Sequence, residues 1–279
     1  MLRKKRDKKR DQERDTERER AFYENGSKLH EKLIASCNGR PIPIRSYSCE
    51  ELQGATNNFD RSRIFHTDGL YEWYNGSFEG RMISIKKHLQ HRGDDIFTDI
   101  AVSAKMSTHN NVLKLIGCCL EAQIPISVYE SAANGSLSGR VYDVTSDRDG
   151  AQQHQREPLS WQSRLKIARE IAHAISYLHT AFSRPIVHRD IKSGNVFLDQ
   201  NDVAKLTDFS WSILIPEERF TINEVVDPAI LVGEEGSVVW QQLEAVLPLA
   251  LICRKKDPEI RPNMVDVTKE LRKIERFIL

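Results

Sequence analysis

The stretch His188-Arg189-Asp190-Ile191-Lys192-Ser193-Gly194-Asn195, followed thirteen residues after Asn195 by Asp208-Phe209, decides the fold. It brings an aspartate, a lysine and an asparagine into six positions and adds a second aspartate at a fixed distance. Such an octet with its spaced Asp-Phe pair is very improbable by chance. It lies in the part of the chain where strand patterns have given way to helix patterns.

The N-terminal side reads as a small sheet with one helix. Residues 64–87 predict strands, because aromatic strand formers and alternating apolar residues recur there. Asn75-Gly76 predicts a hairpin turn between two of these strands. Residues 95–107 predict a helix, and two apolar runs, 112–119 and 124–129, have the length of strands.

The C-terminal side is predicted to be helical. Residues 143–157 are polar and predict a loop. Ser160 then predicts the N-cap of a long amphipathic helix whose apolar stripe faces a core. Pro262 predicts the first turn of a last helix with a stripe of its own. A β-rich half followed by a helical half predicts an α+β domain of two lobes, with residues 61–131 in the first lobe and 132–279 in the second.

Two segments precede the first lobe. Residues 1–20 hold ten Lys or Arg and six Asp or Glu, with seven of the basic residues before position 11. Such a run buries no apolar area, so it is either a disordered tail, the reading we adopt, or a solvated helix. Residues 21–60 are expected to be a helical extension. Within it, Phe22 to Ala35 has helical spacing, and Ser48 with Glu51 forms a capping box.

Composition excludes several functional classes. The chain has 279 residues and a net charge of +1, which gives no global attraction to nucleic acid. Residues 1–10 allow at most a peripheral contact with an anionic membrane surface. No apolar segment follows the basic start, which argues against a secretory signal. Five cysteines without a CxxC pair are expected to be ordinary thiols in a reducing, cytoplasmic compartment.

The octet and Asp208-Phe209 resemble the catalytic loop H-R-D-x-x-x-x-N and the D-F-G motif of protein kinases. Within that superfamily the chain resembles plant receptor-like cytoplasmic kinases of the wall-associated-kinase-like branch, through Ala55-Thr56-Asn57-Asn58-Phe59 and residues 115–121. Leu33-Ile34-Ala35-Ser36-Cys37-Asn38-Gly39 and Pro43-Ile44-Arg45-Ser46 resemble a narrower group. That group contains pseudokinases that plant NLR immune receptors use as sensors of pathogen effectors.

The resemblance implies a role for each site residue. Asp190 would meet the substrate hydroxyl, and Lys192 would contact the γ-phosphate as in serine/threonine kinases. Asn195 and Asp208 would hold Mg²⁺ beside the phosphates of ATP. Three further implied positions are Lys86, as the phosphate-contacting lysine of V-A-I-K, and Glu130 and Ala132, in the hinge against the nucleotide. Tyr129 would be the gatekeeper.

The expected acidic partner of Lys86 is missing from its usual place. Counting back nine residues from His109, where related chains carry a Glu, leads to Ile100. Asp99 adjoins that position, but neighbouring helical residues point about 100° apart. We therefore expect Lys86 to find Asp208, to turn outward or to lose its proton, because an unpaired buried lysine is costly.

The phosphate-binding loop also departs from the family. The three glycines of G-x-G-x-x-G align with His66, Asp68 and Tyr71, which bring bulk and negative charge where backbone N–H groups close over phosphates. Gly69 is present but out of register. Ser210 replaces the glycine of D-F-G, a mild change that leaves Asp208 in place. We expect ATP and Mg²⁺ to bind weakly or not at all.

The largest departure is an internal gap. Only 53 residues separate Asp208 from Arg261, and Val226-Asp227-Pro228 already resembles a segment well beyond the activation loop of the family. The sequence contains no A-P-E motif, whose Glu normally pairs with Arg261. The activation segment and the central helices of the larger lobe are accordingly expected to be missing.

Three functional hypotheses follow. The first is a pseudokinase that acts as an adaptor or decoy for a protein partner, such as an NLR immune receptor or a kinase. The second is an active ATP-dependent serine/threonine kinase, since Lys86, Asp190, Asn195 and Asp208 all remain. The third is a shortened gene or splice product that folds poorly. The lost phosphate loop, the missing acidic partner of Lys86 and the lost substrate platform favour the first.

Overall fold

A computed structural model describes residues 2–37, 44–90, 93–142, 158–182, 184–214, 245–246, 249, 252–253 and 260–276. The chain divides into two units, which are described separately. The first unit comprises Met1–Thr108 and Lys114–Ser131, and the second comprises His109–Leu113 and Ala132–Leu279. The predicted loop at 143–157 and the segment 215–244 lie outside the described residues.

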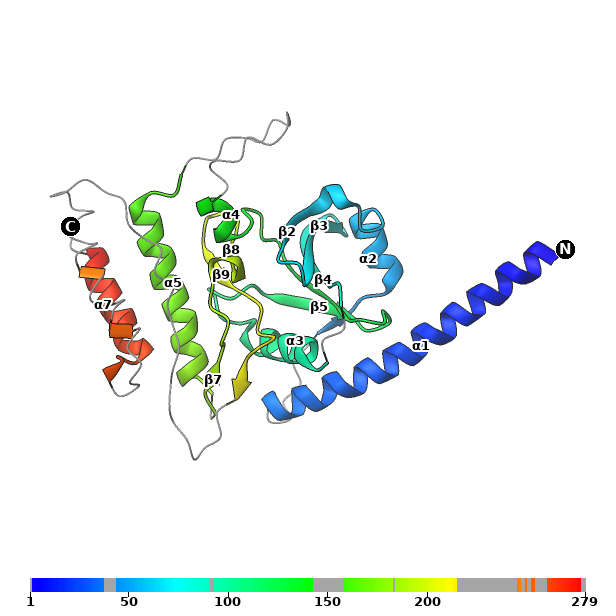
Figure 1. The fold of residues 1–279 in the computed structure, drawn as a ribbon, viewed down its shortest axis with the longest axis horizontal. Coiled ribbons are helices and arrows are strands. Elements are labelled where there is room, and N and C mark those ends of the chain that lie inside the picture. Colours follow the sequence, from blue (N-terminus) through cyan, green and yellow to red (C-terminus); the bar gives the residue numbers. More distant parts are fainter. Residues whose placement is uncertain are drawn as a thin grey trace. The chain divides into compact units, whose positions relative to one another are not determined.

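The first unit is built on a six-stranded sheet (Figure 1). β1 runs parallel to β5, and the other neighbouring strands are antiparallel. In spatial order the strands are β1 (Arg45–Ser46), β5 (Leu115–Cys119), β6 (Ile126–Glu130), β4 (Arg81–His88), β3 (Tyr71–Phe78) and β2 (Ile64–Thr67).

The hairpin turn predicted at Asn75-Gly76 is wrong. Gly76 lies inside β3 and pairs with Ile83 of β4, and the turn is made by Glu79 and Gly80, whose φ angles are +49° and +75°. A Cβ on Gly76 would lie 3.0 Å from Ile85 Cδ1. This glycine therefore serves close packing rather than a turn, a role that glycine also takes within strands.

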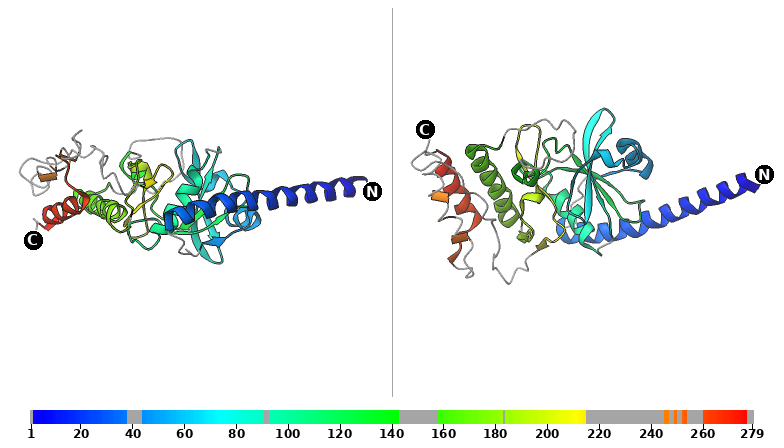
Figure 2. Two further views of the ribbon diagram at one scale, coloured as in Figure 1. Left: turned by 90° about the horizontal axis from the view of Figure 1, so that it is seen from below. Right: turned by 45° about the horizontal axis from the view of Figure 1, so that its top comes forward.

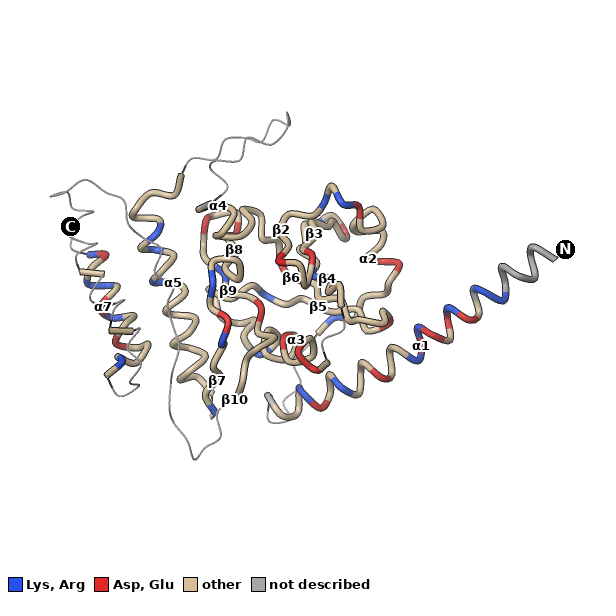
Figure 3. Tube along the Cα trace, viewed as in Figure 1, with Lys and Arg blue, Asp and Glu red and all other residues tan. Residues whose placement is uncertain are grey.

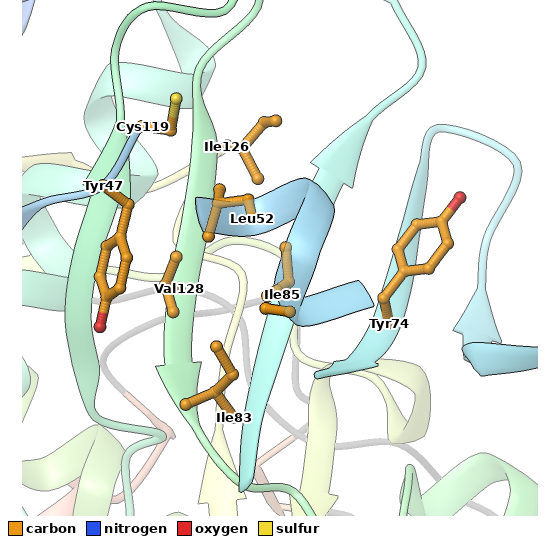
Figure 4. Close-up of a cluster of buried hydrophobic side chains, with 9 residues drawn as sticks. Tyr47, Leu52, Tyr74, Ile83, Ile85, Cys119, Ile126 and Val128 are labelled. Atoms are coloured by element: carbon orange, nitrogen blue, oxygen red, sulfur yellow. The ribbon is translucent and has the colours of Figure 1, made fainter. Parts of the chain in front are cut away.

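The two faces of the sheet have different chemistry. Helix α2 (Cys49–Thr56) covers one face, where Leu52 packs with the row Tyr74, Ile85 and Val128 (Figure 4). The predicted capping box at its start is confirmed, because the Ser48 hydroxyl accepts from the Glu51 N–H at 3.1 Å and the Glu51 carboxylate accepts from the Ser48 N–H at 2.7 Å. The opposite face carries Lys86, since residues alternate between faces along each strand.

Helix α3 (Asp95–Met106) packs against β5 and also against the long helix α1 (Leu2–Cys37). Asn25 anchors α1 to the strand connection after β5, because its side-chain amide donates to the carbonyl oxygens of Leu120 and Ala122, each at 2.9 Å. Contacts from both sides leave most of α3 buried. The helix predicted over 95–107 is thus confirmed.

Residues 2–20, which were expected to belong to a disordered tail, are helical in the structure. These residues continue α1 in one run to Cys37, and Figures 1 and 2 show the helix extending past the sheet toward the N-terminus. Basic and acidic residues alternate along it (Figure 3). Pairs four residues apart, such as Arg20 with Glu24 at 2.7 Å, support a solvated helix without burial of apolar area.

The second unit is mainly helical. Its core packs α5 (Trp161–Thr180) against α7 (Met264–Arg276) and β9 (Ala204–Leu206). Both predicted helices are present, although α7 begins at Met264, so Pro262 precedes its first turn instead of lying in it. Ser160 caps α5 by accepting the Ser163 N–H at 3.1 Å. The shorter elements are α4 (Leu137–Tyr142), β7 (Ile186–Val187), η3 (Ser193–Asn195), β8 (Val196–Leu198) and β10 (Ile213–Leu214). The predicted α+β class is confirmed.

Among the described helices, none combines the length and apolar character that a membrane crossing requires.

Candidate functional site

Lys86 has a carboxylate partner, contrary to the sequence expectation. Its Nζ lies 2.8 Å from Asp99 Oδ2, and both side chains are 0% exposed. The Ser103 hydroxyl donates to the other oxygen of Asp99 at 3.3 Å. The expectations that α3 offers Lys86 no acidic partner and that the lysine turns outward are therefore corrected.

The rotation of α3 explains the correction. Asp99 and Ser103 are four residues apart and share the face of α3 that meets Lys86. Ile100, one residue on, is equally buried but points about 100° away. The acid thus stands one position earlier than the resemblance to kinases implied. The sequence does contain a signal for this acidic partner, because Asp99 and Ser103 are four positions apart and only apolar residues lie between them.

Aromatic side chains enclose the amine of Lys86. Trp73 pairs with Lys86 across β3 and β4 and therefore shares its face of the sheet. Lys86 Nζ lies 4.3 Å from the ring centroid of Tyr71 and 5.9 Å from that of Trp73. The ring centroids of Trp73 and Tyr129 are 5.1 Å apart, and the side chains of Tyr71, Trp73 and Tyr129 are all almost fully buried. The lysine is held by one carboxylate and two cation–π contacts.

The turn between β2 and β3 satisfies its own backbone. Asp68 Oδ1 accepts from the N–H groups of Leu70 at 2.9 Å and Tyr71 at 3.3 Å, and the Thr67 hydroxyl accepts from Gly69 N–H at 3.2 Å. A phosphate-binding loop presents backbone N–H groups of this kind to its ligand. The turn that aligns with the glycine-rich loop is instead closed by an aspartate.

The catalytic-loop residues of the second unit come together. Asp190 Oδ2 accepts from Asn195 Nδ2 at 2.8 Å and lies 2.9 Å from Lys192 Nζ. Asn195 Nδ2 also donates to the Asp190 carbonyl at 2.9 Å, and the fully buried Asn195 side chain fixes the loop. The His188 ring bonds the Thr207 carbonyl at 2.9 Å and so ties this loop to the segment that carries Asp208.

Asp208 is buried, with a left-handed backbone at φ +62°. The Ser210 hydroxyl donates to Asp208 Oδ1 at 2.6 Å. The glycine-to-serine change is therefore more than a loss of backbone freedom, since one carboxylate oxygen is engaged. A carboxylate and an amide remain a suitable donor set for Mg²⁺, which prefers oxygen ligands.

The hinge residues fall in different units. Glu130 ends β6 in the first unit, where its Oε1 accepts from the Lys114 N–H at 3.2 Å. Ala132 is buried in the second unit. Tyr129 is buried on β6, with its hydroxyl 3.5 Å from Ser103 Oγ.

The two units thus differ in their fit to the ligands that the octet implies. The donors of the second unit suit Mg²⁺, whereas the first unit closes its phosphate loop with Asp68 and surrounds Lys86 with rings. An anionic triphosphate would have to displace the Asp68 bonds and meet that carboxylate at close range. The residues of the first unit do not fit a triphosphate.

Comparison with known proteins is consistent with these features. A family model described as protein tyrosine and serine/threonine kinase matches residues 72–228, more than half of the chain. Members of this family in general use ATP with Mg²⁺.

Relatives from Arabidopsis thaliana carry the names of kinases and of pseudokinases. The chain is 34% identical to the serine/threonine-protein kinase ZRK1, over 92% of this chain and 93% of that protein. It is 44% identical to the non-functional pseudokinase ZRK2 (74% of this chain, 56% of that protein) and 35% identical to wall-associated receptor kinase-like 6 (72% and 31%).

The alignment with ZRK1 runs over 333 residues, which exceeds the 279 residues of this chain. The chain therefore lacks residues that ZRK1 has, in keeping with the internal shortening. With the family model, the wall-associated-kinase-like relative and the ZRK relatives together, the chain belongs to the protein tyrosine and serine/threonine kinase family, in the branch of receptor-like cytoplasmic and wall-associated-kinase-like proteins.

Proposed function

We propose that the chain is a pseudokinase, a kinase-shaped protein-binding module with little or no phosphotransfer. The observation that carries this proposal is the closed turn between β2 and β3. Three successive N–H groups, from Gly69 to Tyr71, are satisfied by side chains of the turn itself. Efficient transfer requires every phosphate contact to be positioned at once, so the loss of this set disables the reaction.

The buried pair of Lys86 and Asp99 keeps an ion pair that active kinases also have, so its surroundings, rather than its presence, support the proposal. In an active kinase the corresponding lysine contacts the nucleotide phosphates. Here its amine contacts Asp99 and lies against two rings in a fully buried setting. The pair then serves to fix α3 against the sheet without a nucleotide, which suits a module whose surface is recognised by another protein.

A second candidate, a serine/threonine kinase of the wall-associated-kinase-like type, draws on the second unit. Asp190, Lys192 and Asn195 are hydrogen-bonded or ion-paired there as a catalytic loop requires, and Asp208 remains available as a metal ligand. Under this candidate the turn at Asp68 would open when MgATP binds. Breaking its hydrogen bonds in favour of a like-charged ligand makes that the weaker candidate.

The partner class follows from the family branch. We propose a cytoplasmic protein partner in plant immune or receptor-kinase signalling, such as an NLR immune receptor or a kinase. The basic residues before position 11 would add at most a peripheral contact with the plasma membrane.

Phosphotransfer and folding can be tested together on the full chain. Wild-type protein and Asp190→Asn are incubated with radiolabelled MgATP and a generic protein substrate, and the thermal unfolding of each is recorded. The proposal predicts a cooperative transition in both and no label above the Asp190→Asn background. Label that depends on Asp190 would establish the kinase instead, and a broad or absent transition would identify a shortened product that does not fold.

A further inference from the structure

Two cysteines meet in the first unit, outside the residues that carry the proposed function. Cys49 Sγ lies 3.6 Å from Cys119 Sγ, although the residues are 70 positions apart in sequence. Cys49 is the first residue of α2, and Cys119 ends β5. The sequence suggested only ordinary thiols, because cysteines so distant in the chain form no recognisable motif.

Solvent reaches the two thiols unequally. Cys119 is 0% exposed and belongs to the apolar cluster beneath α2, where Figure 4 shows it beside Ile126. Cys49 is half-buried and packs against the rim of that cluster. A small polar reagent can therefore reach Cys49 first, with Cys119 directly behind it.

The surroundings of Cys49 favour its thiolate. The hydrogen bond from Cys119 and the positive charge of Arg18 lower the pKa of Cys49, and a position in the first turn of a helix acts in the same direction. The hydrogen bond with Cys49 and burial raise the pKa of Cys119. Glu121 accepts the Cys49 N–H at 3.1 Å and so fixes this residue beside its partner.

We propose that Cys49 and Cys119 form an oxidation site, in which a peroxide converts the thiol pair to a disulfide. The Cys49 thiolate attacks one peroxide oxygen, the O–O bond breaks, and Cys49 becomes a sulfenic acid while hydroxide or alkoxide leaves. The Cys119 sulfur then attacks Cys49 Sγ, and the sulfenic hydroxyl leaves with the Cys119 proton as water. The peroxide is reduced by two electrons and the thiol pair is oxidised by two.

Cys118 provides an internal control one residue away. It is buried, and burial raises its pKa as it raises that of Cys119, so the two neighbours differ in their position relative to Cys49 and not in their protonation. Successive residues of a strand face opposite sides, so Cys118 points away from Cys49 while Cys119 points toward it. Oxidation of the site should therefore leave Cys118 unchanged.

The test uses the full chain, in wild-type form and as Cys49→Ser, Cys119→Ser and Cys118→Ser. Each is treated with hydrogen peroxide, free thiols are blocked, and non-reduced peptides are mapped by mass spectrometry. We expect a Cys49–Cys119 link within one chain in the wild type and in Cys118→Ser, and in neither of the other variants. Closing a loop of this length should also raise the Tm of the oxidised wild type by about 5–10 °C.

Other outcomes would overturn the proposal. Oxidation of Cys49 to sulfinic acid without a link would show that Cys119 cannot reach it. A link to Cys118, or between chains, would assign the reactivity elsewhere. One equivalent of zinc retained by the purified wild type, lost in Cys49→Ser and protecting the pair from peroxide, would make this a metal site instead. Because Cys49 lies at the rim, Cys49→Ser remains informative even if Cys119→Ser folds poorly.

Discussion

Replacing Asp99 with asparagine tests the buried ion pair most sharply. The change keeps the shape of the side chain but removes the negative charge that lies 2.8 Å from Lys86 Nζ in a site with no exposure. A buried pair that loses one partner typically costs about 3–5 kcal/mol, because the remaining charge stays buried and loses the attraction of that partner. For a chain of this size that loss corresponds to a fall in Tm of about 6–20 °C.

Urea denaturation followed by circular dichroism measures the effect. Asp94→Asn is the matched control, because Asp94 makes a 3.2 Å ion pair with Lys32 at the surface, where such pairs contribute at most about 1 kcal/mol. The double variant Lys86→Met with Asp99→Leu should recover most of the stability lost in Asp99→Asn, since both charges are then removed.

Ile100→Glu distinguishes the two registers of α3. If position 100 faced Lys86, a glutamate there would restore the pair of an active kinase and would be tolerated. The structure predicts the opposite, because Ile100 is fully buried and Lys86 already forms its ion pair with Asp99. A carboxylate at that position should destabilise the chain by several kcal/mol, about 3 or more. A stable Ile100→Glu, or a loss below about 1 kcal/mol in Asp99→Asn, would refute the reasoning.

Three further predictions concern separate parts of the chain. Burial lowers the pKa of His179 to about 4, so this imidazole is neutral when folded and gains a proton on unfolding below pH 6.5. The contribution of neutral His179 to the free energy of unfolding is complete above pH 6.5 and is about 2 kcal/mol smaller at pH 5. In denaturation experiments, His179→Gln should therefore reduce the dependence of the free energy of unfolding on pH, whereas His30→Gln, at an exposed position, should not. Ser210→Gly removes the hydroxyl that donates to Asp208 Oδ1, which frees this oxygen for a metal ion. Calorimetry should then show Mn²⁺ binding up to about tenfold tighter than in the wild type, and weaker binding would contradict this. Asn25→Ala leaves two carbonyls without their amide donor and should lower the free energy of unfolding by about 1–3 kcal/mol in urea titrations, with an unchanged midpoint as the contrary result.

The sequence predicted the features that depend on local patterns. The capping box at Ser48, the cap at Ser160 and the amphipathic helices follow from residue types at short spacing, and the structure has all of them. The fold class and the family followed from the octet that contains Asp190 and Asn195, because its residues are adjacent and their spacing is fixed.

Features that depend on long-range packing could not be predicted. The spacing to His109 placed the acidic partner of Lys86 at position 100, but packing between α1 and the sheet fixes the rotation of α3, and this presents Asp99. The pair Asn75-Gly76 predicts a turn, because the close approach of α2 and β4 to Gly76 cannot be inferred from local sequence. The meeting of Cys49 with Cys119 likewise depends on the tertiary fold.

Titration calorimetry with MgATP tests most directly whether the first unit binds a triphosphate. Wild type is compared with a variant that carries Asp68→Gly, Tyr71→Gly and Trp73→Val, in which the turn is opened and the rings beside Lys86 are removed. We predict a dissociation constant weaker than about 1 mM for the wild type and measurably tighter binding for the variant. Submillimolar binding by the wild type, with no gain in the variant, would contradict the account.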